Sequence, residues 1–429
     1  MRELNDPAML RAALIDARRR MLALYGHLSP LQLLVPYLRI VNPPLWEMAH
    51  VGWFQEYWCL RHRGSGEPLR SRLPDCDPML NSAIIPHPER WKLPRLTGAS
   101  VSDYLRREFD DTLEALERST PESRYFFALS LYHEDMHSEA MLMTLQTLAL
   151  PEPESSAHGT VPRPVPAPAA GDVAFEGGEF DMGSRQGPDF VFDNELAAHR
   201  VRLEPFALAA VAVTNGEYLA FVEAGGYGRE ELWSQQGWRW REDAGALAPC
   251  YWRREERRWL VRRFDGWEPL RAEDPVMHVN AHEAEAYCRF ARRRLPSEAE
   301  WEFAACADLG LEADRYPWGA EALGQGAFSL DGAYGAPVPA AALPACDSRR
   351  GVRQMIGNVW EWTATAFAPY PGFAPGPYRE YSEPWFHTHR VLRGGCFATR
   401  ARLVHNRWRN FYTPERNDVF AGFRTAVSL

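Results

Sequence analysis

The sequence changes its character abruptly at residues 151–171, and this break constrains the fold more than any other feature. The segment reads PEPESSAHGTVPRPVPAPAAG, which is rich in proline and small residues and lacks hydrophobic periodicity. Such a composition predicts a linker, extended in part, rather than a packed element. Because 429 residues also exceed what one compact core accommodates, we predict one domain over 1–150 and a second over 172–429.

The predicted first domain is helical. Apolar residues recur at helical spacing in four stretches, which are residues 6–28, 43–63, 100–119 and 123–150. An Asp-Pro pair opens the first stretch and two prolines open the second, as is typical of helix starts. Four long helices with connections between them predict an antiparallel four-helix bundle.

The predicted second domain has a different texture. Short alternating runs are punctuated by glycine, proline and asparagine, and only residues 280–294 and 297–308 have a helical pattern. We find no convincing internal repeat. This pattern predicts an irregular α+β domain with short strands, so the chain as a whole is expected to combine an α and an α+β domain.

Charge and composition exclude several classes of protein. The formal net charge of −9 and a pI of about 5.9 argue against binding to nucleic acid. The seven cysteines are odd in number and form no C-x-x-C pair, so neither a disulfide framework nor a zinc ribbon is expected. A signal-peptide pattern and a run of about 18 apolar residues are both lacking. We therefore expect a cytoplasmic protein with no membrane segment and no obligate protein partner.

The stretch HEDMH, residues 133–137, fits the helical zinc signature H-E-x-x-H. His133 and His137 are four residues apart, so both imidazoles share one helix face and can reach one ion. Two histidines on an apolar helix could also be satisfied core residues. His50, in the middle of another apolar helix, offers a third ligand, since facing helices of a bundle build metal sites from inward-pointing side chains.

A zinc protease would need Glu134 as general base and usually a third ligand downstream. Only Glu139 lies nearby on that side, and His158 falls in the proline-rich segment. The protease is therefore the least favoured alternative. Three imidazoles suit zinc, copper, iron and nickel, and the ligands alone do not choose among them.

The combination of His50 with the pattern His133-x-x-x-His137-x-Glu139 resembles the sulfoxide synthases (EgtB, OvoA and SenA type), which pair a DinB-like four-helix bundle with a second domain. That second domain is similar to the formylglycine-generating enzyme or sulfatase-modifying-factor fold, which is C-type-lectin-like. The resemblance covers essentially the whole chain. In the second half it is carried by the segments GGEFDMGS (177–184), FDNELAAHRV (192–201), VAVTNGEYLAF (211–221), RRLPSEAEWEFAA (293–305), PWG (317–319), MIGNVWEWT (355–363), RVLRGGCF (390–397) and FAGFRTA (420–426).

The resemblance implies a non-heme Fe(II) cofactor held by His50, His133 and His137, and a site completed by the second domain. It implies small-molecule substrates: hercynine, the betaine of histidine, as acceptor, dioxygen as oxidant, and a thiol or selenol as donor. The reaction would join the chalcogen to the imidazole carbon between the two nitrogens. Iron can carry electrons from the donor to dioxygen and hold the partners close together.

A proton donor must stand near the reacting oxygen, and the family places a tyrosine ahead of the segment RVLRGG. Alignment of residues 372–386 with that region assigns the role to Tyr378, with Tyr381 as its neighbour and fallback. A packed tyrosine with a bonded hydroxyl is the alternative for either residue.

For hercynine, the resemblance implies a contact from Asn410, and an aromatic wall suits the quaternary ammonium group through cation–π contact. Trp408 and Phe411 lie beside Asn410 and could form that wall or belong to the core. Family members with the motif HENQH contact the substrate imidazole through the glutamine. Met136 stands at that position here, so this contact is absent or replaced.

The donor-binding positions depart from the branch that uses γ-glutamylcysteine. They read His87, Arg90, Tyr412 and Arg416, with one cation and one anion of that branch lost. A neutral donor rich in hydroxyl groups fits this change, since Tyr and His can hydrogen-bond hydroxyls. The SenA branch of the family uses such a donor, 1-seleno-glucose, and the aromatic-rich stretch VGWFQEYW (51–58) after His50 also resembles that branch. The resemblance therefore implies a selenoneine synthase, with an ergothioneine-type enzyme using cysteine or γ-glutamylcysteine as the alternative.

Formylglycine chemistry is a further alternative for the second domain, but it needs a copper-binding cysteine pair after the segment RGG. Thr399 and Val404 stand where that pair would fall, and Cys396 is alone. We interpret Cys396 as a small packing residue, although its place near the expected site leaves a chemical role open.

Overall fold

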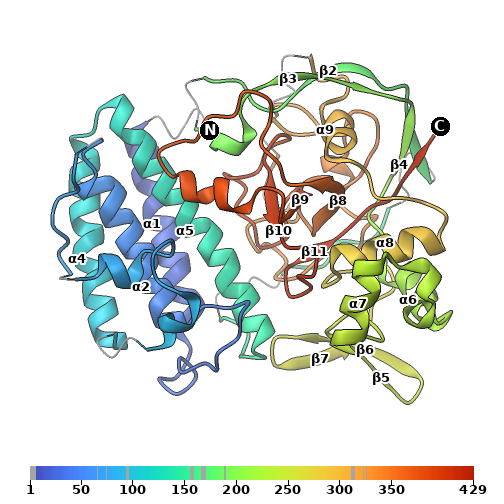
Figure 1. Ribbon diagram of the computed structural model, residues 1–429, viewed down its shortest axis with the longest axis horizontal. Helices are drawn as coiled ribbons and strands as arrows, with labels where there is room; N and C mark the ends of the chain where they lie inside the picture. Colours follow the sequence, from blue (N-terminus) through green and yellow to red (C-terminus); the bar gives the residue numbers. More distant parts are fainter. Residues whose placement is uncertain are drawn as a thin grey trace. The chain divides into compact units, whose positions relative to one another are not determined.

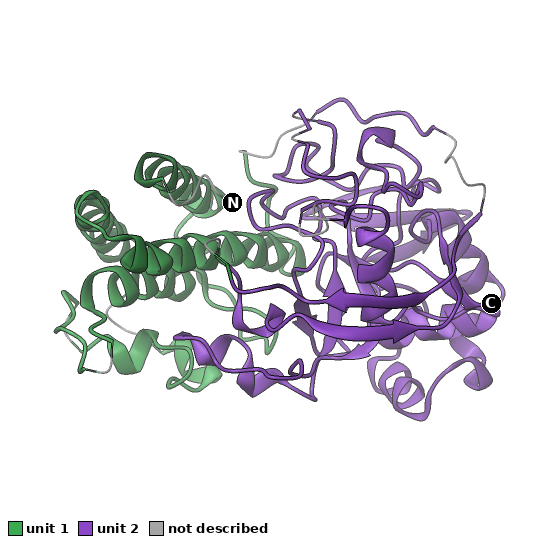
Figure 2. Ribbon diagram, turned by 90° about the horizontal axis from the view of Figure 1, so that it is seen from above, with its two compact units in different colours: residues 1–155, 187–190 green, residues 156–186, 191–429 purple. Residues whose placement is uncertain are grey.

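The computed structural model describes residues 6–64, 66–73, 75–92, 96–154, 159–165, 171–187, 190–310, 315–321, 323–324 and 326–429. The chain divides into two compact units (Figure 2). Unit 1 comprises residues 1–155 and 187–190, and unit 2 comprises residues 156–186 and 191–429. The short segment 187–190 therefore belongs to unit 1, although the residues on both sides of it belong to unit 2.

Unit 1 is built on four long helices that lie side by side (Figure 1). Their bounds are α1 (Pro7–Gly26), α2 (Pro44–Gln55), α4 (Gly98–Glu117) and α5 (Pro121–Thr147). Side chains of Asp6, Thr97 and Thr120 accept hydrogen bonds from the first turns of α1, α4 and α5, which satisfies backbone donors that a helix start leaves unpaired. The predicted helical bundle is confirmed.

The helix predicted over 43–63 changes its form after Gln55. It continues as a π-helical turn, η2 (Glu56–Arg61), and is followed by the short helix α3 (Asp77–Leu80) and the 3-10 turn η3 (His87–Trp91). The Asp77 carboxylate accepts two hydrogen bonds from Arg61, at 2.9 and 2.6 Å, and one from the Trp53 indole at 2.7 Å. These bonds connect α3 to α2 and to the π-helical turn η2, and no sequence pattern predicted this connection.

Phe190 completes an aromatic cluster of unit 1. Its ring lies 5.0 Å from that of Tyr125 and 5.0 Å from that of Tyr132, both on α5. These ring contacts join Phe190 to unit 1, which explains why the division of the chain departs from a simple cut at the linker.

The described residues of unit 2 form four small sheets, in keeping with the predicted irregular α+β fold. Their orders are β1-β4-β12, β10-β9-β8-β11, β2-β3 and β5-β6-β7, and β8 and β11 pair in parallel. The bounds are β1 (Asp172–Phe175), β2 (Gly178–Met182), β3 (His199–Leu203), β4 (Phe206–Ala209), β5 (Trp252–Glu255), β6 (Arg258–Arg263), β7 (Gly266–Pro269), β8 (Trp360–Ala366), β9 (Arg390–Arg393), β10 (Asn410–Tyr412), β11 (Ala421–Gly422) and β12 (Ala426–Ser428).

Four α-helices lie in the part of unit 2 that the structure describes, and the sequence pattern predicted two of them. Helices α8 (Ala281–Phe290) and α9 (Glu298–Cys306) were expected, whereas α6 (Asn215–Glu223) and α7 (Gln235–Ala244) were not, so the expectation of only two helical stretches is wrong. The missed helices have nine and ten residues, as many as the predicted α9 and α8, so their length does not explain why they were missed. The caps of both were readable in the sequence, since α6 begins with a Thr214–Glu217 capping box and α7 follows Ser234.

Buried ion pairs hold the loop-rich core of unit 2 together. The Arg424 guanidinium bonds both oxygens of Glu361 at 2.7 Å, and the indole of Trp301 donates to the same carboxylate at 2.8 Å. Two further arginines, Arg393 and Arg409, donate hydrogen bonds to Glu298. Because these charges are buried and hydrogen-bonded to one another, they fix loops that lack regular backbone pairing.

The predicted linker is divided between the two units, with residues 151–154 in unit 1 and 159–165 in unit 2. Residues 159–165 form no helix or strand. The amide of Val165 donates to the carbonyl of Ala341 at 2.9 Å, and Arg353 donates to the carbonyl of Val165. The parts of the predicted linker at residues 155–158, which include His158, and at 166–170 lie outside the described residues.

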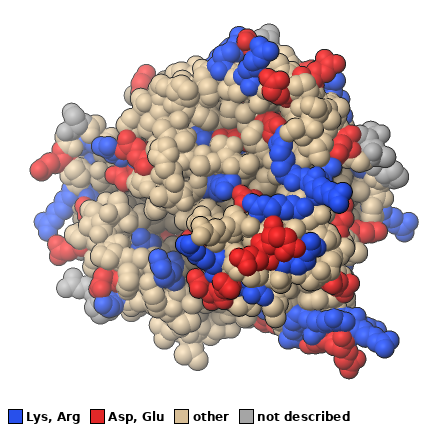
Figure 3. Space-filling view, turned by 45° about the vertical axis from the view of Figure 1, so that its right-hand side comes forward, with Lys and Arg blue, Asp and Glu red and all other residues tan. Residues whose placement is uncertain are grey.

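On the face that Figure 3 draws, arginine and acidic side chains are interspersed, and neither sign of charge dominates. No helix within the described ranges has both the length and the apolar character of a transmembrane segment.

Candidate metal centre

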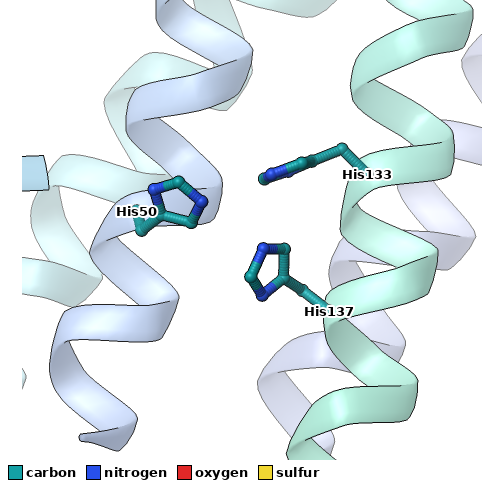
Figure 4. Close-up of side chains that lie close together, drawn as sticks. All are labelled: His50, His133 and His137. Carbon is teal, nitrogen blue, oxygen red and sulfur yellow. The ribbon is translucent and has the colours of Figure 1, made fainter. Parts of the chain in front are cut away.

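His50, His133 and His137 converge inside unit 1 (Figure 4). His50 comes from the middle of α2, and His133 and His137 lie one turn apart on α5. One potential ligand atom from each residue lies within 4.8 Å of the other two. The structure therefore brings together the three histidines that the sequence predicted as ligands.

Hydrogen bonds fix the tautomers of two of these imidazoles. The Nδ1 atom of His50 lies 2.7 Å from the carbonyl oxygen of Leu80, and the Nδ1 atom of His137 lies 2.8 Å from Oε1 of Glu47. A carbonyl and a carboxylate only accept, so each Nδ1 carries the hydrogen. The Nε2 atoms of His50 and His137 are left with the lone pairs that a metal ion requires.

Flat aromatic contacts fix the planes of the rings. His133 stacks on Phe54 with centroids 3.6 Å apart and planes 5° apart. His50 stacks on Trp46 with centroids 4.8 Å apart and planes 7° apart. Rings held in this way need little reorganisation to bind an ion, which favours a preformed site.

The electrostatic setting keeps the imidazoles of His50 and His133 neutral. Burial, and after it the neighbouring His137, lower the pKa of His50 and of His133 well below the usual value. A neutral imidazole is the form that ligates a metal. The donor set therefore fits a borderline divalent cation such as Fe(II), and it would leave coordination positions for substrates.

The structure adds Glu47 to the site. Its side chain is buried and accepts hydrogen bonds from His137, from the Tyr25 hydroxyl at 3.3 Å and from the Asn42 amide at 3.5 Å. Sequence reasoning missed it, although Glu47 lies three residues before His50 and so almost one helical turn away. The pKa of Tyr25 is raised by burial and by this carboxylate.

Glu134, the base that a zinc protease would need, is engaged elsewhere. Its carboxylate accepts a hydrogen bond from Arg18 of α1 at 2.8 Å, and both side chains are buried. The same guanidinium donates to Gln55 at 2.9 Å and lies 3.4 Å from Glu108. An anion held by a buried cation is a poor general base, so this geometry speaks against the protease.

Arg90 is one of the predicted donor-binding residues in unit 1, and the ring of Trp46 lies between it and His50. Its guanidinium stands 4.2 Å from the ring centroid of Trp46, which also stacks on His50, and it donates to Asn42 at 2.7 Å. His87 bonds the carbonyl of Val41 through Nε2 at 2.9 Å. Burial lowers the pKa of both Arg90 and His87.

Met136, predicted near hercynine, is half-buried on α5, between the two histidines of that helix. Glu139 of the same motif is buried, and it does not belong to the three-histidine cluster.

The predicted hercynine residues of unit 2 lie at strand β10, which pairs with β9. Trp408 is buried and packs edge-on against Trp360 at 5.0 Å, while Phe411 stacks on Phe367 at 4.0 Å. The Asn410 side chain accepts from the amide of Phe411 at 2.8 Å. Trp408 and Phe411 thus have the packing contacts that the core alternative expects.

Arg416 and Tyr412, the donor-binding residues predicted in unit 2, contact each other. The Arg416 guanidinium bonds both oxygens of Asp418, at 2.5 and 2.6 Å, and lies 5.2 Å from the ring centroid of Tyr412. A charge already paired in this way is less available to a substrate carboxylate.

The two candidate tyrosines lie in one anchored loop. The Asp193 carboxylate accepts from the Ser382 hydroxyl at 2.5 Å and from the amide of Gly376 at 3.0 Å. Tyr381 stacks on Phe192 at 4.5 Å, and Tyr378 lies 6.1 Å from Tyr381. Burial and then Glu195 raise the pKa of Tyr381 well above its usual value, so its hydroxyl stays protonated.

Cys396 is fully buried, and its amide donates to the Thr399 hydroxyl at 2.9 Å. These contacts agree with a packing role.

Known proteins match the chain over both predicted domains. Residues 13–141 match the DinB superfamily, and residues 158–429 match the sulfatase-modifying factor enzyme 1-like domain. The hercynine oxygenase of Mycobacterium tuberculosis is 37% identical over 99% of this chain and 100% of its own length. That of Mycolicibacterium thermoresistibile is 36% identical over 98% of this chain and 94% of its own length. The chain belongs to the hercynine oxygenase family.

Family membership accounts for the bundle and the α+β domain together. The formylglycine-generating enzyme of Streptomyces coelicolor is 33% identical but spans only 65% of this chain, against 96% of its own length. Among solved structures, that of PvdO from Pseudomonas aeruginosa covers 60% of this chain with a TM-score of 0.43 and 22% identity, which is too weak a likeness to bear on function.

Proposed function

We propose that this protein is an iron(II)-dependent hercynine oxygenase that joins a sulfur donor to the imidazole carbon of hercynine as a sulfoxide. The observation that carries the proposal is the cluster of His50, His133 and His137 in a chain that aligns end to end with proteins named hercynine oxygenase. Three imidazoles also suit zinc, copper and nickel, and the consumption of dioxygen favours iron among these.

The overall reaction balances with one dioxygen. The thiol and the carbon between the imidazole nitrogens each lose a hydrogen, and a carbon–sulfur bond forms. One oxygen atom remains on sulfur and the other leaves as water with both hydrogens, so the donor and acceptor together supply the four electrons that dioxygen takes up. When bound, the iron would mediate this electron transfer.

The protein's own residues would bind, orient and move protons. In this proposal Tyr378 supplies a proton near the reacting oxygen, and Asn410, with Trp408 and Phe411, binds the betaine. Met136 replaces a polar contact to the substrate imidazole with an apolar one. The anchored loop around Asp193 supports Tyr378, because a fixed backbone keeps a proton donor in reach.

We place an ergothioneine-type donor, cysteine or γ-glutamylcysteine, before the selenosugar that the donor positions suggested, because the relatives are named hercynine oxygenase and that name specifies no selenium donor. The selenosugar remains a second candidate because of one observation. Arg416 is paired with Asp418 and Tyr412 carries no charge, so this group offers little to a charged amino acid. A neutral sugar would need only hydrogen bonds there.

Oxygen uptake tests both readings. The metal-free protein is loaded with Fe(II) without oxygen, and dioxygen consumption is then followed with hercynine and, in turn, cysteine, γ-glutamylcysteine, thioglucose or selenoglucose. We expect uptake that needs both substrates and a product in which the donor is attached to hercynine, seen by mass spectrometry. Preference for selenoglucose would identify a selenoneine synthase, and uptake with none of the donors would overturn the proposal.

A further inference from the structure

We propose that Glu47 is a positioning residue of the metal centre, whose carboxylate fixes the tautomer of His137 and places a negative charge directly behind that imidazole. This inference rests on the proposed metal-dependent function. It concerns a residue that lies outside the histidine motif.

The geometry of Glu47 is that of a bridge between two helices. It lies on α2, three residues before His50, yet its Oε1 atom meets Nδ1 of His137 on α5 at 2.8 Å. Its exposed fraction is 1%, so water does not compete for this contact. The hydroxyl of Tyr25 holds the second oxygen at 3.3 Å, which keeps the carboxylate in its orientation.

A comparison of His137 with His50 shows what the negative charge of Glu47 adds. Its Nδ1 atom donates to the backbone carbonyl of Leu80 at 2.7 Å, a neutral acceptor that fixes the tautomer without supplying charge. The carboxylate of Glu47 does both for His137. The two ligands thus receive the same orientation but different electrostatic support.

Two consequences follow for a bound ion. A carboxylate that accepts from Nδ1 makes Nε2 of the same ring more basic and strengthens its bond to a cation. A buried negative charge near the ion also stabilises the more highly charged oxidation state, because the field is weakly screened there. Glu47 should therefore raise the metal affinity and lower the reduction potential of bound iron.

The test uses the full-length, metal-free protein and Co(II) as an optical probe, without substrates. Glu47→Gln keeps a carbonyl oxygen that can accept from Nδ1 but removes the charge, while Glu47→Ala removes both. Glu56→Gln is the matched control, since Glu56 is equally buried and also accepts from a tyrosine hydroxyl, that of Tyr104 at 2.5 Å. Thermal unfolding of each variant measures the cost to the fold.

We expect Co(II) to bind Glu47→Gln about 10–100-fold more weakly than wild type, and Glu47→Ala more weakly still. Glu56→Gln should bind as wild type does, even if its melting temperature falls as far. In the iron-loaded protein the midpoint potential of Glu47→Gln should lie above that of wild type and of Glu56→Gln. Heteronuclear NMR of the wild-type histidine side chains should show the hydrogen of His137 on Nδ1.

Equal Co(II) affinity of the two Gln variants, or an unchanged potential, would overturn the inference while leaving the proposed function standing. So would a hydrogen on Nε2 of His137, a result that needs no variant to fold. Failure of wild type itself to bind Co(II) or Fe(II) would instead overturn the proposed function, and the inference would fall with it.

Discussion

Arg18 and Glu134 form an ion pair at 2.8 Å in the interior of the helical bundle, with the carboxylate wholly shielded from solvent. Glu134 is the residue that gives the sequence its protease-like motif, and its neighbour His133 contributes to the metal centre. Successive residues of a helix point about 100° apart, so one side chain can serve the metal while the next joins α1 to α5. In this motif, Glu134 thus makes a structural ion pair and His133 is a candidate metal ligand, so the two do not form a catalytic pair.

Glu134→Gln should destabilise the fold and spare the metal centre. Loss of one partner of a buried ion pair costs about 3 kcal/mol. Urea unfolding measures the loss and Co(II) titration the metal affinity. Glu114→Gln, at an exposed pair with Arg118, serves as the control. Loss of Co(II) binding in a folded Glu134→Gln protein would contradict this role.

Glu108 should make the bundle less stable as pH rises. Burial raises the pKa of its carboxyl to about 8, against the opposing effect of Arg18, whereas an unfolded Glu has a pKa of about 4.3. Between these values the folded state holds a proton that the unfolded state has released, so stability falls with increasing pH. Glu108→Gln removes this ionisation, and its unfolding free energy should fall less, by on the order of 2 kcal/mol, between about pH 5 and 8. If the unfolding free energies of variant and wild type fall equally with pH, the assignment of this pH dependence to Glu108 is wrong.

Each of the three histidines should be needed for metal binding. His50→Ala, His133→Ala and His137→Ala should each weaken Co(II) binding by at least about 100-fold, because a lost ligand costs more than a lost partner of a ligand. His62→Ala is the matched control, since His62 packs on Trp58 at 4.7 Å outside the cluster. A variant of the cluster that binds Co(II) like His62→Ala would remove that residue from the ligand set.

Asp77→Asn should loosen the support of His50. The carboxylate holds α3 through Arg61 and Trp53, and α3 ends at Leu80, the acceptor for His50. Because Asp77 is 41% exposed, we expect a stability loss of only about 1 kcal/mol, together with weaker Co(II) binding. The hydrogen bond from Arg61 lowers the pKa of Asp77, so its contribution is lost as pH falls through that pKa. Asp103→Asn, at an exposed pair, should change neither quantity.

Tyr378→Phe should reduce product formation by at least about tenfold if its hydroxyl donates a proton, with Co(II) binding unchanged. Tyr381→Phe is the internal comparison, because Tyr381 packs on Phe192 in the same loop. Product formation by both Fe(II)-loaded variants, with hercynine and the preferred donor, decides between them. The reverse order of effects would transfer the role to Tyr381.

Sequence reasoning reached the elements whose signal is local. Helical periodicity predicted the bundle, and the i, i+4 spacing paired His133 with His137, because both rules concern residues close together on one helix. His50 lies on another helix, and it was added because facing helices of a bundle build metal sites and because the family resemblance implied it. The supports of these ligands were not readable in this way. Leu80 contributes only a backbone carbonyl, and Asp77 acts across 24 residues to Trp53. Arg416 had a readable charge, but its pairing with Asp418 depends on side-chain orientation within a loop.

The packing of Phe190 on Tyr125 and Tyr132 bears on how the protein can be dissected. A fragment ending at residue 155 would keep all three histidines and the described helices of unit 1 but would lack the Phe190 ring that packs on both tyrosines. Cloning the bundle as one continuous piece would therefore remove part of its own aromatic packing. The two units alternate along the sequence. A better route to an independent bundle is therefore to join residues 187–190 to residue 155 through a short peptide loop.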